Sequence, residues 1–286
     1  MHTFAYARPG TLAEAAALLA AHGPDARLLA GGTDLLIRLR DGSERPAVVV
    51  DVKRIAELRP SIVETPGCVT IGATTAMTEI AGSDVVRRRF PALAEAAAVV
   101  GSVQIRNRAT LAGNICNASP AADTAPPLLV YGASVVVHGP EGARQLPVDE
   151  LFVKSGVTTL RRGELVTAIE IPVSGRKIGA VHVRRTRRRG HDLASVTLCC
   201  GVDDAGVTRI AYGSVGPRPV LTVDESGVLA DPHAPGSAKA AILERMFAAA
   251  SPSPRSMRAS PSYRLAMLRV LGVRALETAI ARLAEG

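Results

Sequence analysis

The chain has 286 residues, 47% hydrophobic and 21% charged, so it is predicted to be globular, with one large domain or two moderate ones, rather than disordered or fibrous. Aromatic residues make up only 3%, so the core must be built mainly from Ala, Val, Leu and Ile. The net charge of +8 favours anionic partners but does not choose among phosphate-bearing cofactors, acidic protein surfaces and nucleic acids.

The first half of the chain is predicted to mix helices and strands. Thr11 and Glu14 have the spacing of a capping box, which predicts a helix that ends at Gly23. The other elements predicted in this half are strands at 27–30 and 47–52, helices at 33–40, 78–86 and 92–100, and a hairpin at 61–73 that turns at Pro66-Gly67.

A long polar stretch at 102–123 is predicted to be a loop, and loops of this length inside a compact domain are usually functional. Strands are predicted at 133–138 and 165–171, followed by a joint at 172–175. The remainder is predicted to have its own strands, at 180–185, 194–202 and 207–214, and helices at 239–249 and 260–283. Ser260 caps the last helix and Pro261 occupies its first turn, where the missing N–H costs little.

The cysteines do not have the spacing of a metal or cluster site. Cys199 and Cys200 alternate faces if they lie on a strand, and no CxxC pair occurs, so we expect no iron–sulfur cluster and no zinc in this chain. The first residues lack the pattern of a signal peptide, and the most apolar windows are too short to span a bilayer. We therefore expect a soluble, cytoplasmic protein.

The first candidate binding segment is a strand that runs into Gly-Gly and then into a helix. Exposed backbone N–H groups in such a turn suit a phosphate or pyrophosphate, although a purely structural turn remains an alternative. Asp34 is an awkward phosphate contact, so we expect it to cap the helix. The residues of this segment are Leu29, Ala30, Gly31, Gly32, Thr33, Asp34, Leu35 and Leu36.

The second candidate segment is the polar stretch from Gln104 to Asp123. It combines amides, hydroxyls and one carboxylate with small residues, an inventory that fits hydrogen bonding to a polyhydroxy chain and phosphates rather than acid–base chemistry. Satisfaction of these groups by local turns is the structural alternative. The basic run from Arg184 to Arg189 is interpreted as a solvated strand end or a face for an acidic partner, because nucleic-acid sites usually bring aromatic platforms.

Together, LLAGGTDLL and QIRNRATLAGNICNASPAAD resemble the FAD-binding, or medium, subunit of the molybdenum hydroxylases, the family of xanthine dehydrogenase and carbon monoxide dehydrogenase. The resemblance extends over essentially the whole chain, through FAYARPGTLAEAAALL, TIGATTAMTEI, ELVTAIEIP, RRRGHDLASVT, GSVGPRPV and RASPSYRLAMLRVL.

The resemblance implies an α+β fold: a vanillyl-alcohol-oxidase (PCMH) type FAD-binding domain at 1–174, with lobes at about 1–55 and 56–174, and a smaller α+β C-terminal domain at 175–286. It also implies that 30–36 wraps the FAD pyrophosphate and that the second segment forms the opposite wall. The wall residues are Thr110, Ala112, Gly113 and Asn114, with Ser119 and Asp123 toward the polar edge of the cofactor, Leu165 against the flavin ring and Arg184 or Arg185 near its carbonyl side.

Two positions depart from the family's pattern. Ala112-Gly113 stands where relatives often have two glycines, and arginine stands at the basic position near the ring where lysine is common.

The resemblance further implies that no residue of this chain is catalytic in its own right. FAD would take electrons from [2Fe-2S] clusters of a small subunit, which receive them from molybdopterin in a large subunit, and pass them to NAD or another acceptor. The assembly would be a heterotrimer or a dimer of heterotrimers. The alternatives are a self-sufficient flavoenzyme of the same FAD fold and a non-catalytic protein that binds an anion or nucleic acid.

Overall fold

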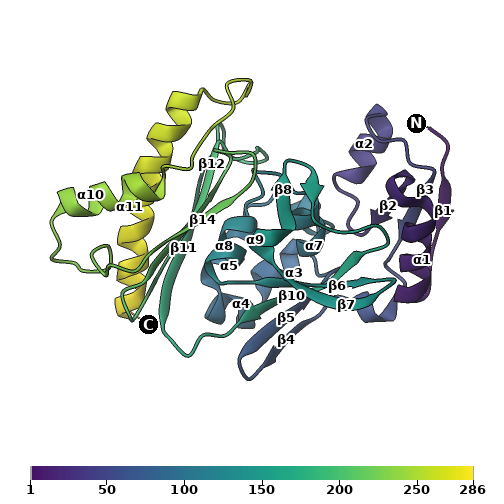
Figure 1. The fold of residues 1–286 in the computed structure, drawn as a ribbon, viewed down its shortest axis with the longest axis horizontal. Coiled ribbons are helices and arrows are strands. Elements are labelled where there is room, and N and C mark those ends of the chain that lie inside the picture. Colours follow the sequence, from purple (N-terminus) through teal and green to yellow (C-terminus); the bar gives the residue numbers. More distant parts are fainter. Residues whose placement is uncertain (1, 286) are drawn as a thin grey trace.

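The computed structural model describes residues 2–285 as a row of sheets covered by helices (Figure 1). In Figure 1 the N-terminal lobe lies at the right, a larger sheet lies in the centre, and a third sheet lies at the left beside a short helix and a long one. Helices and strands are mixed throughout, which confirms the predicted α+β class.

The N-terminal lobe is a parallel sheet with strand order β1-β3-β2. Its strands are β1 (Ala5–Ala7), β2 (Ala26–Leu29) and β3 (Val48–Asp51), and its helices are α1 (Leu12–His22), the 3-10 turn η1 (Gly23–Asp25) and α2 (Leu35–Asp41). Thr11 Oγ1 accepts a hydrogen bond from Glu14 N at 3.2 Å, which confirms the predicted helix start. The prediction missed β1, which is too short to carry a periodic pattern.

The central lobe is an antiparallel sheet with strand order β4-β5-β10-β6-β7. Its strands are β4 (Ile62–Thr65), β5 (Cys68–Gly72), β6 (Ser134–Gly139), β7 (Gly142–Pro147) and β10 (Leu165–Pro172); β8 (Phe152–Lys154) and β9 (Val157–Thr158) form a small separate pair. The hairpin predicted at 61–73 is confirmed, with Thr65 paired to Cys68 across the Pro66-Gly67 turn.

Short helices fill one face of the central lobe: the 3-10 turn η2 (Ala56–Leu58), α3 (Met77–Gly82), α4 (Asp84–Arg89), α5 (Pro91–Ala98), α6 (Val103–Arg106), α7 (Leu111–Cys116), α8 (Ala125–Val130) and α9 (Val148–Leu151). Two predictions are corrected here. The helix predicted at 78–86 is broken at Ser83, whose extended backbone ends α3 and whose hydroxyl caps α4 by accepting from Val86 N at 3.3 Å. The stretch 102–123 is not a structureless loop, because it contains α6 and α7.

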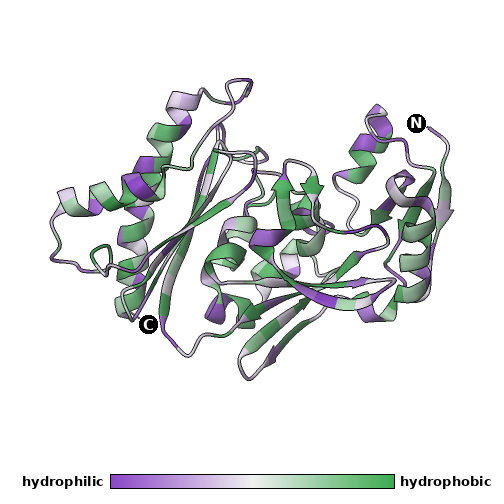
Figure 2. Ribbon diagram, in the orientation of Figure 1, coloured by the Kyte–Doolittle hydropathy of each residue, from purple (hydrophilic) through white to green (hydrophobic). Residues whose placement is uncertain are grey.

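The C-terminal sheet is antiparallel with order β11-β12-β13-β14, built from β11 (Ile178–Arg185), β12 (Val196–Asp203), β13 (Thr208–Gly213) and β14 (Val220–Asp224). Helices α10 (Gly236–Met246) and α11 (Pro261–Glu285) belong to this part. In Figure 2 hydrophobic and hydrophilic residues alternate along both helices, as expected for amphipathic helices that cover one face of a sheet. Ser260 Oγ accepts from Tyr263 N at 3.2 Å, which confirms the predicted start of the last helix.

The C-terminal sheet separates two hydrophobic cores. One core lies between this sheet and α10 and α11 and includes Cys200, whereas the other fills the two N-terminal lobes and includes Cys199. The prediction that these neighbouring cysteines point to opposite faces of a strand is therefore confirmed. Ala180, Cys199 and Ala211 of the C-terminal sheet belong to the core of the N-terminal lobes, so the two parts of the chain share one core.

Among residues 2–285, no helix combines the length and the apolar character that crossing a membrane requires.

Candidate cofactor site

A cavity of about 560 Å³ lies where the two N-terminal lobes and the C-terminal part meet. Four segments from three regions of the sequence form its walls: the turn after β2, helix α7 with the loop at 119–123 that follows it, and the loop at 191–193. Its volume falls within the range of about 300–1,000 Å³ that is usual for small-molecule and cofactor pockets.

The Gly31-Gly32 turn forms the first wall. Gly32 has a φ of +75°, which favours glycine, and its carbonyl accepts a hydrogen bond from Leu36 N at 2.9 Å. A Cβ at Gly31 would collide with the carbonyl oxygen of Arg108, so this glycine is needed because the two candidate segments touch.

One prediction about the first wall is wrong. Asp34 precedes α2, but among the residues described its side chain does not accept a capping hydrogen bond; its backbone is already helical, which removes the extended geometry that a cap requires. Asp34 instead lines the cavity.

Helix α7 forms the second wall. Thr110 caps it by accepting a hydrogen bond from Gly113 N at 3.1 Å, and Thr124 donates its hydroxyl to Asn114 Oδ1 at 2.7 Å. Arg38 of α2 donates to Asn117 Oδ1 at the end of α7, so a side-chain bridge joins the two walls.

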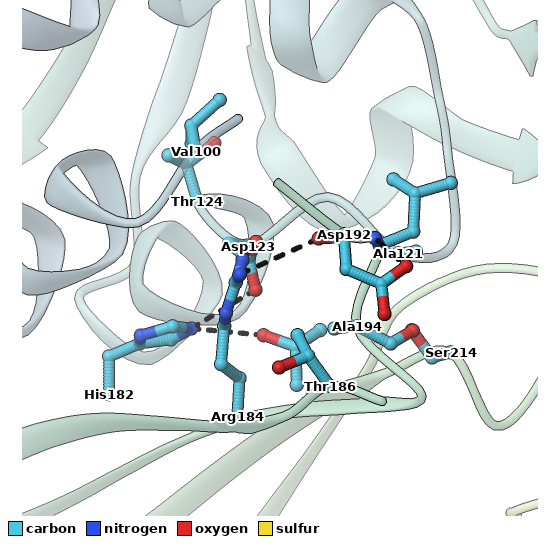
Figure 3. A network of polar contacts seen from close by, with 12 residues as sticks. Val100, Ala121, Asp123, Thr124, His182, Arg184, Thr186, Asp192, Ala194 and Ser214 are labelled. Atoms are coloured by element: carbon cyan, nitrogen blue, oxygen red, sulfur yellow. Dashed lines mark hydrogen bonds and ion pairs between the residues drawn. The ribbon is translucent and has the colours of Figure 1, made fainter. Parts of the chain in front are cut away.

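Asp123 is the carboxylate of the third wall, and its two oxygens differ. Oδ2 accepts from Arg184 Nη1 at 2.5 Å (Figure 3), whereas Oδ1 is buried and has no hydrogen-bond partner within residues 2–285. His182 Nε2 lies 3.6 Å from Oδ1, beyond hydrogen-bond distance, and contacts Thr197 Oγ1 at 2.9 Å. A buried polar oxygen without a partner costs free energy, which makes Oδ1 an unusual feature of the wall beside this cavity.

Asp192 lines the cavity and organises its fourth wall through hydrogen bonds within the chain. Its carboxylate accepts from Arg187 Nη2 and from Leu193 N, both at 3.0 Å, and its carbonyl oxygen lies 3.5 Å from Arg184 Nη2 (Figure 3). The hydrogen bond and charge of Arg187 lower the pKa of Asp192 to about 2, so the carboxylate is ionised at neutral pH. Arg188 donates to His191 O at 3.0 Å. Arg187 and Arg188 of the basic run at 184–189 therefore bind the chain's own loop, and the contact of Arg187 with Asp192 supports a structural role for that carboxylate.

Most of the residues singled out from the sequence line this one cavity: Ala30, Gly31, Gly32, Thr33, Asp34, Leu35, Thr110, Ala112, Gly113, Asn114, Ser119, Asp123 and Leu165. Three do not. Leu29 and Leu36 pack beneath Gly32, and Arg184 lies behind Asp123, which it holds.

Sequence reasoning missed several lining residues. Arg38 and Asn117 lie within or beside the predicted motifs, and their polar side chains were the available signal. Val100, Gly101, Ser155, Gly156, His191 and Leu193 come from segments whose local pattern gives no sign of a shared site. Among residues 2–285, no cluster of three or more His, Cys, Asp and Glu side chains could hold a metal ion.

Two family descriptions match the chain. Residues 2–174 match the FAD binding domain in molybdopterin dehydrogenase, and residues 182–279 match the CO dehydrogenase flavoprotein C-terminal domain.

Individual relatives agree with these matches over nearly the full chain. The xanthine dehydrogenase FAD-binding subunit of Escherichia coli O157:H7 is 32% identical, with 96% of each chain covered. The carbon monoxide dehydrogenase medium chain of Hydrogenophaga pseudoflava is 32% identical, with 98% of each chain covered. A solved structure of carbon monoxide dehydrogenase from the same organism superposes with a TM-score of 0.89 at 31% identity, covering 98% of each chain.

Proposed function

Since the chain belongs to the family of FAD-binding subunits of molybdopterin dehydrogenases, we propose that it transfers electrons within a larger oxidoreductase complex. It would take them from iron–sulfur clusters of a small partner subunit, downstream of molybdopterin in a large subunit, and deliver them to NAD or another acceptor. The names of its relatives, which are subunits or medium chains of xanthine and carbon monoxide dehydrogenases, support this proposal.

The cavity residues fit FAD. The observation that carries this assignment is the Gly31-Gly32 turn at the wall of a cavity of cofactor size: Gly32 has a φ of +75°, and a Cβ at Gly31 would collide with the Arg108 carbonyl oxygen. When bound, FAD supplies a redox centre that accepts electrons singly or in pairs, and the protein supplies binding, orientation and electrostatics.

Each wall then has a proposed role. The backbone N–H groups of 30–35 bind the pyrophosphate, and Thr110, Gly113 and Asn114 form the opposite wall near the phosphates and ribityl chain. Ser119 and Asp123 bind the polar edge, and Leu165 packs near the ring. Arg184 contributes indirectly, because its guanidinium holds the Asp123 side chain in place by a hydrogen bond to Oδ2.

FAD retention tests this assignment. Purified chain is incubated with FAD, freed of excess by gel filtration and examined by absorbance, alone and co-purified with its partner subunits. We expect Gly32→Val to lose flavin and Gly67→Val to keep it. Both glycines have positive φ, +75° and +87°, so both variants carry backbone strain, but only Gly32 lines the cavity. Absence of flavin from the wild-type complex would exclude the proposal.

The electron acceptor is tested separately. If NAD is the acceptor, NADH should bleach the flavin absorbance of the FAD-loaded complex by the reverse reaction. Persistence of the oxidised spectrum would assign another acceptor. Mass photometry of the same complex distinguishes a heterotrimer from a dimer of heterotrimers.

A further inference from the structure

A second cavity, of about 770 Å³, is lined by the connection from β10 to β11, a segment that Figure 1 draws near its lower edge. Within residues 2–285 it shares no lining residue with the cofactor cavity. Its walls come from the end of α4, the end of α8, the connection after β10, strands β12 and β13, and α11. A molecule bound here would therefore contact both the central lobe and the C-terminal part.

Cationic side chains dominate this lining. Six of them face a single lining carboxylate, that of Asp203; the cations are Arg88, Arg89, Arg176, Lys177, Arg209 and Arg282. Four are paired within the chain: Arg88 and Arg89 share Glu64 at 2.7 Å each, Arg209 binds Asp203 at 3.0 Å, and Arg282 binds Glu95 at 2.6 Å. Three carboxylates therefore pair with four of the six cations.

The two remaining cations, Arg176 and Lys177, are exposed, and within residues 2–285 their side chains form no hydrogen bond or ion pair. Their backbones are fixed. Arg176 N donates to Ser174 Oγ at 2.9 Å, and Lys177 N donates to Asp204 Oδ2 at 3.2 Å. Within residues 2–285 the connection thus presents to the cavity two positively charged side chains that have no ion-pair partner.

The inner part of this cavity is apolar. Phe90 and Tyr131 pack edge to face, with ring centroids 5.0 Å apart, beside Leu129, Val130 and Ile178. Cations above an apolar floor suit a molecule with a charged end and a less polar body. Arginine is well suited to phosphate, because its planar fork of donors matches the phosphate oxygens.

We propose that this cavity binds a small molecule that carries two or more phosphates, of about nucleotide size. The excess of cations calls for a polyanion, and the volume lies within the range of small-molecule pockets. This site is independent of the cofactor cavity.

ADP is the probe, titrated calorimetrically into FAD-saturated chain so that the cofactor cavity is already filled. We expect ADP and pyrophosphate to bind and adenosine not to bind. Arg176→Ala/Lys177→Ala should weaken ADP binding by about tenfold or more, since two charged donors are lost. The charge-matched control Arg255→Ala/Arg274→Ala removes two exposed cations outside the lining and should leave ADP binding unchanged.

Three results would overturn the proposal. The first is no ADP binding by the wild-type chain. The second is an equal loss of affinity in both double variants, which would indicate general charge attraction that salt screens. The third is release of the partner subunits by Arg176→Ala/Lys177→Ala with ADP binding unaltered, which would identify this surface as a contact for an acidic protein segment.

Discussion

Replacement of Gly31 by alanine tests whether close packing of the two binding segments forms the cofactor cavity. The added Cβ would collide with the Arg108 carbonyl oxygen and lie 2.9 Å from the Arg108 carbonyl carbon and 3.1 Å from Ala109 Cα. All three atoms belong to the backbone, so no flexible side chain can move aside. The φ of Gly31 lies outside the left-handed region, so the expected damage is steric and not torsional.

The expected loss follows from overpacking of a dense interior, which typically costs about 1–3 kcal/mol. For a chain of this size, each kcal/mol lowers Tm by roughly 2–4 °C. Urea unfolding followed by circular dichroism measures the loss, and flavin absorbance after gel filtration measures FAD retention, which should fall as well because the displaced segments are the cavity walls.

Gly82→Ala is the matched control. A Cβ there meets nothing within 4 Å, and Gly82 is the last residue of α3. Alanine in a helix should leave stability unchanged or raise it by about 0.5–1 kcal/mol. Wild-type stability in the Gly31→Ala variant would show that the segments can separate at no cost, and the reasoning from their contact would be refuted.

Three further predictions concern the C-terminal part. Arg187 lowers the pKa of Asp192 from 3.8 to about 2, so the stabilisation from this pair is complete above about pH 4 and is lost as the pH falls toward 2. In urea unfolding measured across this pH range, Asp192→Asn should therefore show a smaller change of stability with pH than the wild-type chain. Arg264 is buried and donates to two backbone carbonyls at 2.8 and 2.5 Å, so Arg264→Met should destabilise the chain by about 1–3 kcal/mol for each carbonyl left without a donor; unchanged unfolding would contradict this. Burial raises the pKa of Cys200 to about 12 and that of Cys199 well above its usual value, so peptide mapping after iodoacetamide treatment should find neither thiol modified until the chain unfolds.

Predictions from sequence succeeded where the signal was local. Thr11 caps α1, Pro66-Gly67 turns the hairpin, and adjacent Cys199 and Cys200 point to opposite cores, because each depends on a few neighbouring residues. The stretch 102–123 could not be predicted in the same way. Helices of four and six residues are unstable alone, so α6 and α7 exist because the surrounding lobe packs against them.

The site shows the same division. Gly31, Gly32 and Asn114 are recognisable because each lies in a short segment rich in backbone or amide donors. The approach of His191 and Leu193 to that segment is not recognisable, because it results from the packing of the C-terminal sheet on the central lobe. Arg184 is predicted to lie near the flavin ring, but the sequence could not indicate that it binds Asp123 and is not among the residues that line the cavity.

Contacts across the predicted boundary near residue 174 help to build the cofactor cavity. Asp123 belongs to the central lobe, but the guanidinium that holds it comes from β11. Ser214, at the end of β13, donates its backbone N–H to Pro120 O at 2.6 Å and so fixes the loop that carries Asp123. Three side chains of the C-terminal sheet, those of Ala180, Cys199 and Ala211, also complete the core of the N-terminal lobes. Removing that sheet would therefore expose apolar surface and, at the same time, open the cavity wall. We therefore expect FAD retention and the stability of the junction between the two parts of the chain to fall together when either is weakened.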